Sequence, residues 1–143
     1  MAKASKTKPP ARSPQKKTLR SPLKKTQSKP LPQTWDTVRK LALALPGAEE
    51  STSYGTPAFK VRGKLFVRLH QSGEALVVGI DENDRALRMK ADPETYFITD
   101  HYLAYPWILV RLSLVPEDDL RELLEDAWRR VAPQSLIDSH GPP

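Results

Sequence analysis

Two segments of the chain repeat apolar residues at helical spacing, and each predicts an amphipathic helix. The predicted helices cover residues 34–45 and 116–131, and a shorter helix is expected over residues 82–90. Thr34 is placed to cap the first helix and Pro46-Gly47 ends it, while Pro116 is expected at the first helical position of the last one. The expected apolar faces are Trp35, Val38, Leu41, Ala42 and Leu45, and Leu120, Leu123, Leu124, Ala127, Trp128 and Val131.

Between these helices the pattern changes to short alternating runs, which predict strands. The expected strands cover residues 49–54, 58–62, 64–69, 75–80 and 107–112. A tight hairpin turn is predicted near Arg62-Gly63. The strand after Pro106 is apolar on both faces, which places it in the interior of the sheet. The predicted fold is α+β: a two-layer sandwich in which an antiparallel sheet of about five strands carries the N- and C-terminal helices on one face.

Alternation also predicts which side chains occupy the sheet face that the helices leave open. The residues expected to face the helices are Phe59, Val61, Leu65, Val67, Leu69, Ile108, Val110 and Leu112. The opposite face then carries Lys60, Arg62, Lys64, Phe66, Arg68, Trp107 and Arg111, without an acid. Bases interleaved with rings are what single-stranded nucleic-acid binders present. The alternative is an ordinary half-exposed sheet whose long bases cover Phe66 and Trp107.

The charges of the chain divide at about residue 32. Residues 1–32 hold eight Lys and two Arg without Asp or Glu, which gives +10. The remaining 13 bases stand against all 17 acids, so the rest of the chain carries −4. With six prolines and no aromatic residue, this basic arm has too little apolar surface to fold by itself. A basic arm joined to an acidic domain predicts contact with nucleic acid.

The basic arm repeats the pattern Arg-Ser-Pro-x-Lys-Lys-Thr-x at residues 12–19 and 20–27. Each copy resembles the Ser-Pro-Lys-Lys elements of linker-histone tails, which implies binding in the minor groove of A·T-rich DNA. A Ser-Pro turn would direct the flanking bases toward a narrow groove of negative potential. The alternatives are a solubilising linker, an unspecific polycation, or a transit peptide, which the prolines oppose. The candidate DNA-binding residues are Arg12, Ser13, Pro14, Lys16, Lys17, Arg20, Ser21, Pro22, Lys24 and Lys25.

Catalytic and metal-binding patterns have little support in this sequence. There is no Cys, and His70, His101 and His140 are not at metal-ligand spacing, so we expect no metal, no cofactor and no enzymatic activity. Asp100-His101 is an acid–base candidate, but adjacent residues generally point apart and no nucleophile is marked. Neither a bilayer-spanning apolar run nor the apolar region of a secretory signal is found, so we expect a soluble cytoplasmic protein.

Several short motifs follow one another in a distinctive order. They are Leu45-Pro46-Gly47, Gly55, Phe59, Gly63-Lys64-Leu65-Phe66, Asp92-Pro93, Phe97, Thr99, His101-Tyr102, Trp107, Arg111-Leu112 and the helical run 116–131. Over residues 34–132 this order resembles the MmcQ/YjbR family of small bacterial proteins. The resemblance implies a frataxin-like α+β sandwich and DNA binding. Frataxin-type iron binding does not carry over, because the first helix offers only Asp36, beside Arg39 and Lys40.

We therefore predict a non-enzymatic protein that binds DNA largely independently of sequence, through the basic arm with help from the open sheet face. The predicted organisation is a disordered arm over residues 1–32, the α+β domain over 33–133 and a flexible tail over 134–143. The alternative is a module that binds a protein or small ligand at the sheet face or the Thr99–Pro106 loop, with the arm incidental. A third is an enzyme that uses His101. We expect a monomer, cytoplasmic and able to associate with the nucleoid.

Overall fold

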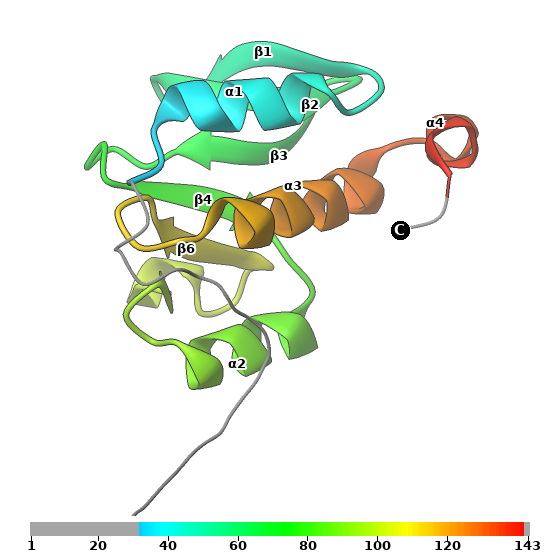
Figure 1. The fold of residues 1–143 in the computed structure, drawn as a ribbon. Helices are drawn as coiled ribbons and strands as arrows, with labels where there is room; N and C mark the ends of the chain where they lie inside the picture. Colours follow the sequence, from blue (N-terminus) through cyan, green and yellow to red (C-terminus); the bar gives the residue numbers. More distant parts are fainter. Residues whose placement is uncertain (1–31, 142–143) are drawn as a thin grey trace, which may run out of the picture. The chain divides into compact units, whose positions relative to one another are not determined.

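The computed structural model describes residues 32–141, and Figure 1 shows their fold. Within these residues, four α-helices, a short 3-10 helix and a six-stranded antiparallel sheet form an α+β domain. The helices are α1 (Trp35–Leu43), α2 (Glu82–Ala91), η2 (Asp100–Tyr102), α3 (Glu117–Val131) and α4 (Gln134–His140). The strands are β1 (Ala48–Ser53), β2 (Thr56–Val61), β3 (Lys64–Leu69), β4 (Ala75–Gly79), β5 (Tyr96–Phe97) and β6 (Trp107–Arg111).

The two predicted amphipathic helices, α1 and α3, pack on the same face of the sheet (Figure 1). Val38, Leu41 and Ala42 of α1 are buried, as are five residues of the predicted apolar face of α3. The Trp128 indole N–H donates to the Pro46 carbonyl across 2.8 Å and joins α3 to the turn after α1. These contacts agree with the two-layer arrangement that the sequence predicts.

The sheet runs in the order β1-β2-β3-β4-β6-β5, with every neighbouring pair antiparallel. Strand β6 lies between β4 and β5, which confirms the interior position predicted from its two apolar faces. Strand β5 is the sixth strand where about five are predicted. It has only two residues, Tyr96 and Phe97, which is too short to show an alternating pattern.

A β-bulge changes which side chains of β3 face the helices. Lys60 pairs with Leu65 and Phe59 pairs with Val67, so Phe66 is an extra residue on β3. Because of this extra residue, both Phe66 and Val67 are fully buried in the core beneath α1 and α3. Leu65 turns to the opposite face. The prediction that Leu65 faces the helices and Phe66 faces outward is therefore wrong.

The C-terminal part of the domain differs from the prediction in two respects. Pro116 is the N-cap of α3 rather than its first helical residue, because its backbone is extended with ψ 150°. Residues 134–140 form α4, where a flexible tail over 134–143 is predicted. Leu136 and Ile137 of α4 pack against the core. Two adjacent apolar residues carry no detectable period, so the sequence pattern does not reveal this helix.

Candidate functional site

The sheet face opposite α1 and α3 is partly covered by the loop between β5 and β6. Tyr102 of this loop forms an apolar cluster with Val77 and Leu109, and Trp107 packs against the cluster. Arg68 lies opposite Val77, and Val77 lies opposite Leu109, so these three side chains share one face of the sheet. This face therefore has a floor of strand residues and a wall of loop residues.

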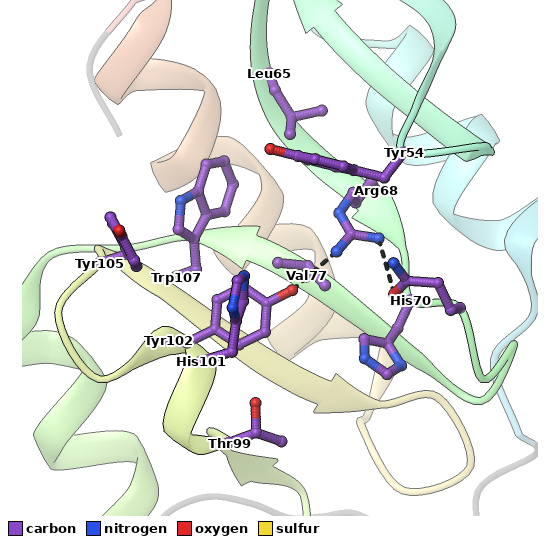
Figure 2. Close-up of a pocket in the computed structure, with 11 residues that line it drawn as sticks. Tyr54, Leu65, Arg68, His70, Val77, Thr99, His101, Tyr102, Tyr105 and Trp107 are labelled. Atoms are coloured by element: carbon purple, nitrogen blue, oxygen red, sulfur yellow. Dashed lines mark hydrogen bonds between the residues drawn. The ribbon is translucent and has the colours of Figure 1, made fainter.

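A pocket of about 660 Å³ opens between this loop and the hairpin that joins β1 to β2 (Figure 2). Its lining is Tyr54, Leu65, Arg68, His70, Gln71, Val77, Thr99, His101, Tyr102, Tyr105 and Trp107. Six of these eleven residues carry an aromatic or imidazole ring, and no acid is found among the described lining residues. Small-molecule sites usually measure about 300–1,000 Å³, so this pocket has the size and the apolar walls of such a site.

Arg68 is buried at the centre of the pocket, with 4% of its surface exposed. Its Nη2 donates to the Tyr102 hydroxyl at 2.8 Å, and its Nη1 donates to the Leu69 carbonyl at 3.2 Å and the Gln71 amide oxygen at 3.4 Å. The Tyr54 ring lies over the guanidinium, 5.0 Å from its carbon (Figure 2). All of these partners are neutral. Between residues 32 and 141 no carboxylate forms an ion pair with Arg68.

Tyr54 reaches the guanidinium because of the turn in which it lies. Tyr54 and Gly55 have φ values of 52° and 80°, and together they reverse the chain between β1 and β2. A tyrosine in this left-handed region is uncommon, whereas glycine adopts it without strain. The Tyr54 side chain is largely exposed, with its ring against Arg68. The turn thus presents an aromatic ring at the pocket mouth.

Arg85 of α2 holds the loop wall of the pocket in place. It is buried, and its Nη1 donates to the carbonyls of Tyr102, Tyr105 and Trp107 at 3.0, 2.7 and 3.1 Å. Its Nη2 donates to the Leu103 carbonyl at 3.2 Å. One guanidinium therefore satisfies four backbone acceptors of a single loop. The sequence pattern does not reveal this residue, because nothing in the polar pattern of α2 distinguishes it from the other charges of that helix.

The two histidines of the pocket differ in environment. The pKa of His70 is lowered by burial and, to a lesser extent, by the positive charge of Arg68. Its Nδ1 lies 3.2 Å from the Ser72 backbone nitrogen and accepts that hydrogen bond, as an unprotonated Nδ1 can. His101 is exposed, and its ring lies edge-on to Tyr102 with a centroid separation of 4.8 Å. The lowered pKa of His70 favours its neutral form near pH 7.

The described residues offer neither a metal-binding cluster nor a membrane-spanning helix. No three His, Cys, Asp or Glu side chains of the described chain are grouped to hold a metal ion. Asp36, the one acid of α1, is paired with Arg39 at 2.7 Å. Of the helices described, none has both the length and the apolar character needed to span a membrane.

The bases predicted for the sheet face do not form one exposed patch with the rings. Arg68 and Trp107 line the pocket, but Arg68 is buried and Trp107 is half-buried. Phe66 lies in the core instead. Lys60 is half-buried and lies opposite Glu49 of β1, so the two side chains share a face. The prediction of an acid-free face with an exposed Arg68 is therefore wrong.

The remaining predicted bases lie at the periphery. Arg62 is exposed in the hairpin turn, where its φ of 52° confirms the predicted tight reversal. Lys64 is exposed at the start of β3, but it lies opposite Val61, whose side chain is in the core, so the prediction that Lys64 lies on the open face is wrong. Arg111 is also exposed, but its guanidinium lies 4.3 Å from the Phe97 ring and its Nε donates to the Glu94 carbonyl at 2.7 Å. The candidate DNA-binding residues of the basic arm lie outside the described residues.

Comparison with known proteins places the chain among uncharacterised bacterial relatives. An uncharacterized protein of Mycobacterium tuberculosis, Rv2570, is 31% identical, with 73% of this chain and 92% of the relative covered. The Mycobacterium bovis protein Mb2600, also uncharacterized, matches equally well. The crystal structure of the Deinococcus radiodurans protein DR2400, a DUF419 domain, shares the fold with a TM-score of 0.63. The two sequences are 23% identical, and the match covers 78% of this chain and 90% of the Deinococcus chain. The YjbR family model matches residues 43–130, and the chain belongs to the YjbR family.

Proposed function

We propose that the folded domain is a non-enzymatic binding module whose pocket receives an anionic group of its ligand at Arg68. The observation that carries this proposal is a buried guanidinium with neutral partners in a ring-lined pocket. A buried charge without a counter-charge is costly, and a bound anion would neutralise it. The planar fork of arginine also matches the geometry of carboxylate and phosphate oxygens.

The fixed position of the pocket walls supports the same function. Arg85 holds the loop backbone through four carbonyls, and the Tyr102 hydroxyl is held by Arg68. A site whose side chains are already in place loses less entropy when the ligand binds. The described lining offers rings, hydroxyls and one guanidinium, without a carboxylate base beside a nucleophile, so the proposal contains no reaction.

The test compares binding of small anions and neutral molecules to the full chain and to two arginine variants. Arg68→Met removes the buried charge at similar volume, and Arg62→Met removes an exposed one in the hairpin turn. We expect anionic fragments to raise the melting temperature of the wild type and of Arg62→Met but not of Arg68→Met. Equal stabilisation by neutral fragments, or full retention of the effect in a folded Arg68→Met protein, would overturn the proposal.

A second function, DNA binding through the basic arm, is favoured by a separate observation. Residues 1–32 carry +10 while the rest of the chain carries −4, and the arm contains two Ser-Pro-x-Lys-Lys copies. Contacts between lysines and phosphates are largely independent of sequence, and they weaken steeply with salt. DNA titration of the full chain against residues 33–143, at several salt concentrations, tests this function. In this view the protein is cytoplasmic and associates with the nucleoid through its arm.

We further propose that the α+β sandwich is of the frataxin-like type. Its support is the order of elements, with α1 at the start and α3 near the end of the domain on one face of an antiparallel sheet. Iron binding is not part of this proposal, since Asp36 of α1 is already paired with Arg39. An experimental structure superposed on frataxins would test it, and a different order of strands in the sheet would contradict it.

A further inference from the structure

Building on the proposed function of the pocket, we infer that its ligand is a small aromatic monocarboxylate: a flat ring system that carries a single carboxylate. Two properties of the pocket, beyond the presence of Arg68, point to this class of ligand. One is the number of charges that the pocket can neutralise, and the other is the arrangement of rings around them. The number of charges indicates the anionic group of the ligand, and the arrangement of rings indicates the shape of the rest of the ligand.

The permanent charge of the described lining matches one negative charge. Arg68 is the single Lys or Arg among the residues that line the pocket between positions 32 and 141. Burial and the charge of Arg68 lower the pKa of His70, which favours its neutral form near pH 7. A carboxylate brings one negative charge, whereas a phosphate monoester brings about 1.5 to 2 at pH 7. The excess charge of a phosphate would remain unmatched among the ring walls, which is unfavourable.

The rings of the pocket are placed to contact a flat ligand. Trp107 lies opposite Gly79 on the sheet, and a Cβ at Gly79 would come within 3.5 Å of the indole. The indole therefore lies over Gly79, at a separation where a Cβ would make an ordinary van der Waals contact. Tyr54 and Tyr105 are exposed at 78% and 56%, although both line the pocket. Exposed rings gain most from stacking against a ligand, because they lose contact with water on binding.

The guanidinium and the rings lie close enough for one ligand to use both. The Tyr54 ring centroid is 5.0 Å from the Arg68 guanidinium carbon, and the Tyr102 hydroxyl is 2.8 Å from Arg68 Nη2. Figure 2 shows the guanidinium between these two tyrosines, with the Trp107 indole beside them. A carboxylate that pairs with Arg68 in the pocket would place an attached ring system among the aromatic side chains. The volume of about 660 Å³ leaves room for a bicyclic ring.

The experiment follows the three tryptophan indole N–H signals of the full chain by two-dimensional NMR. Trp107 lines the pocket, whereas Trp128 is buried in the core and Trp35 stacks on Phe59, so only the Trp107 signal reports on the pocket. This readout separates binding in the pocket from attraction of anions to the basic arm. The probes are 2-naphthoate, its neutral amide 2-naphthamide, 2-naphthyl phosphate, cyclohexanecarboxylate and the peptide Gly-Gly-Gly-Phe.

We expect 2-naphthoate to shift the Trp107 signal with the highest affinity of the set. The amide should bind at least about tenfold more weakly, the effect of losing a charge-assisted hydrogen bond. Cyclohexanecarboxylate keeps the charge without the flat ring, and it should bind about two- to tenfold more weakly, the effect of losing one aromatic contact.

Variants identify the residues that produce these differences. Arg68→Met should abolish the preference for naphthoate over the amide. Tyr54→Asn should weaken naphthoate binding about two- to tenfold. This second variant preserves the fold, because Tyr54 is exposed and asparagine tolerates its positive φ. Arg62→Met, which removes an exposed arginine outside the pocket, should leave both affinities unchanged.

The possible results separate this inference from the function on which it rests. If 2-naphthyl phosphate binds more tightly than 2-naphthoate, the pocket is an anion site but the monocarboxylate class is wrong. If Gly-Gly-Gly-Phe shifts the Trp107 signal and 2-naphthoate does not, the carboxylate belongs to a peptide terminus and the small-molecule class is wrong. If none of the anions shifts the signal, both the inference and the proposed pocket function are wrong.

Discussion

Arg68 on β3 and Tyr102 in η2 are joined by a hydrogen bond of 2.8 Å from the guanidinium Nη2 to the phenol oxygen. The two residues lie 34 positions apart in the sequence. The Tyr102 ring packs against Val77 and Leu109, so the hydroxyl is the polar end of an otherwise apolar contact. This bond fixes the loop between β5 and β6 on the sheet and also orients the buried cation.

Replacing Tyr102 by Phe removes this acceptor while keeping the ring. We expect the free energy of unfolding to fall by about 1–3 kcal/mol, the usual effect of leaving a buried donor unsatisfied. Urea denaturation measures the change. Tyr54→Phe is the matched control, because that side chain is mostly exposed, and it should change stability by no more than about 0.5 kcal/mol. Equal effects of the two substitutions would show that the Arg68–Tyr102 bond contributes little.

Replacing Arg85 by Lys keeps the charge but not the planar fork that reaches four carbonyls. We expect a loss of about 2–3 kcal/mol, because lysine cannot reach all four carbonyls and each lost hydrogen bond from a charged donor contributes about 1.5–3 kcal/mol. Hydrogen exchange of the Tyr105 and Trp107 amides should accelerate more than exchange of core strand amides. Arg121→Lys is the control, since Arg121 pairs with two exposed carboxylates on α3. Unchanged protection of the loop in Arg85→Lys would contradict this role.

The lowered pKa of His70 predicts a pH dependence of stability. Its folded-state pKa lies below the ordinary value of about 6.5, so the folded protein disfavours the protonated ring. The stability that follows from this lowered pKa is fully present above pH 6.5. It declines as the pH falls from there through the folded-state pKa. The wild type should therefore lose more stability than His70→Gln between pH 7.5 and the folded-state pKa, as followed by urea denaturation. An NMR titration that gives His70 a midpoint at or above 6.5 would refute this expectation.

Features of the fold that rest on a pattern repeated along a segment are predictable from the sequence, and the local irregularities are not. The stripes of α1 and α3 repeat over several turns, and the interior position of β6 follows from apolar residues on both its faces. The bulge at Phe66 cannot be read from alternation, because one extra residue reverses the face of Leu65 and keeps Val67 in the core. Strand β5 and helix α4 are too short for their periods to be detected.

The candidate site was predictable only in part, because its chemistry depends on distant contacts. The alternation of β3 predicts that Arg68 lies on the sheet face opposite the helices, and residues of the Thr99–Pro106 loop line the same pocket as Arg68. The burial of Arg68 depends on the Tyr102 loop and on the turn that carries Tyr54, and neither contact has a local sequence signal. The role of Arg85 likewise depends on where the loop carbonyls lie.

Removing residues 1–32 tests the proposed role of the basic arm, because it changes the formal charge from +6 to −4. We expect DNA affinity to fall to near nothing, since an acidic domain is repelled by phosphate. If the full-length protein neutralises about six phosphates, log K should fall with log salt at a slope near −5, which is about a thousandfold between 50 and 200 mM. Filter binding or fluorescence anisotropy measures both quantities. Undiminished binding by residues 33–143 would exclude the arm as the binding element.

The Ser-Pro repeats add an expectation that a plain polycation does not share. If each Ser-Pro turn directs its flanking bases into the minor groove, A·T-rich duplexes should compete better than G·C-rich ones, because their groove is narrower and more negative. Replacing Pro14 and Pro22 by Ala removes the turn-favouring residues but none of the ten positive charges. The preference for A·T-rich duplexes should then decrease while the salt slope stays nearly the same, since that slope reflects only the number of phosphates neutralised. Equal competition by both duplexes in the wild type would reduce the repeats to an unspecific polycation, and a changed slope in the Pro variant would show that the prolines also set how many charges reach the DNA.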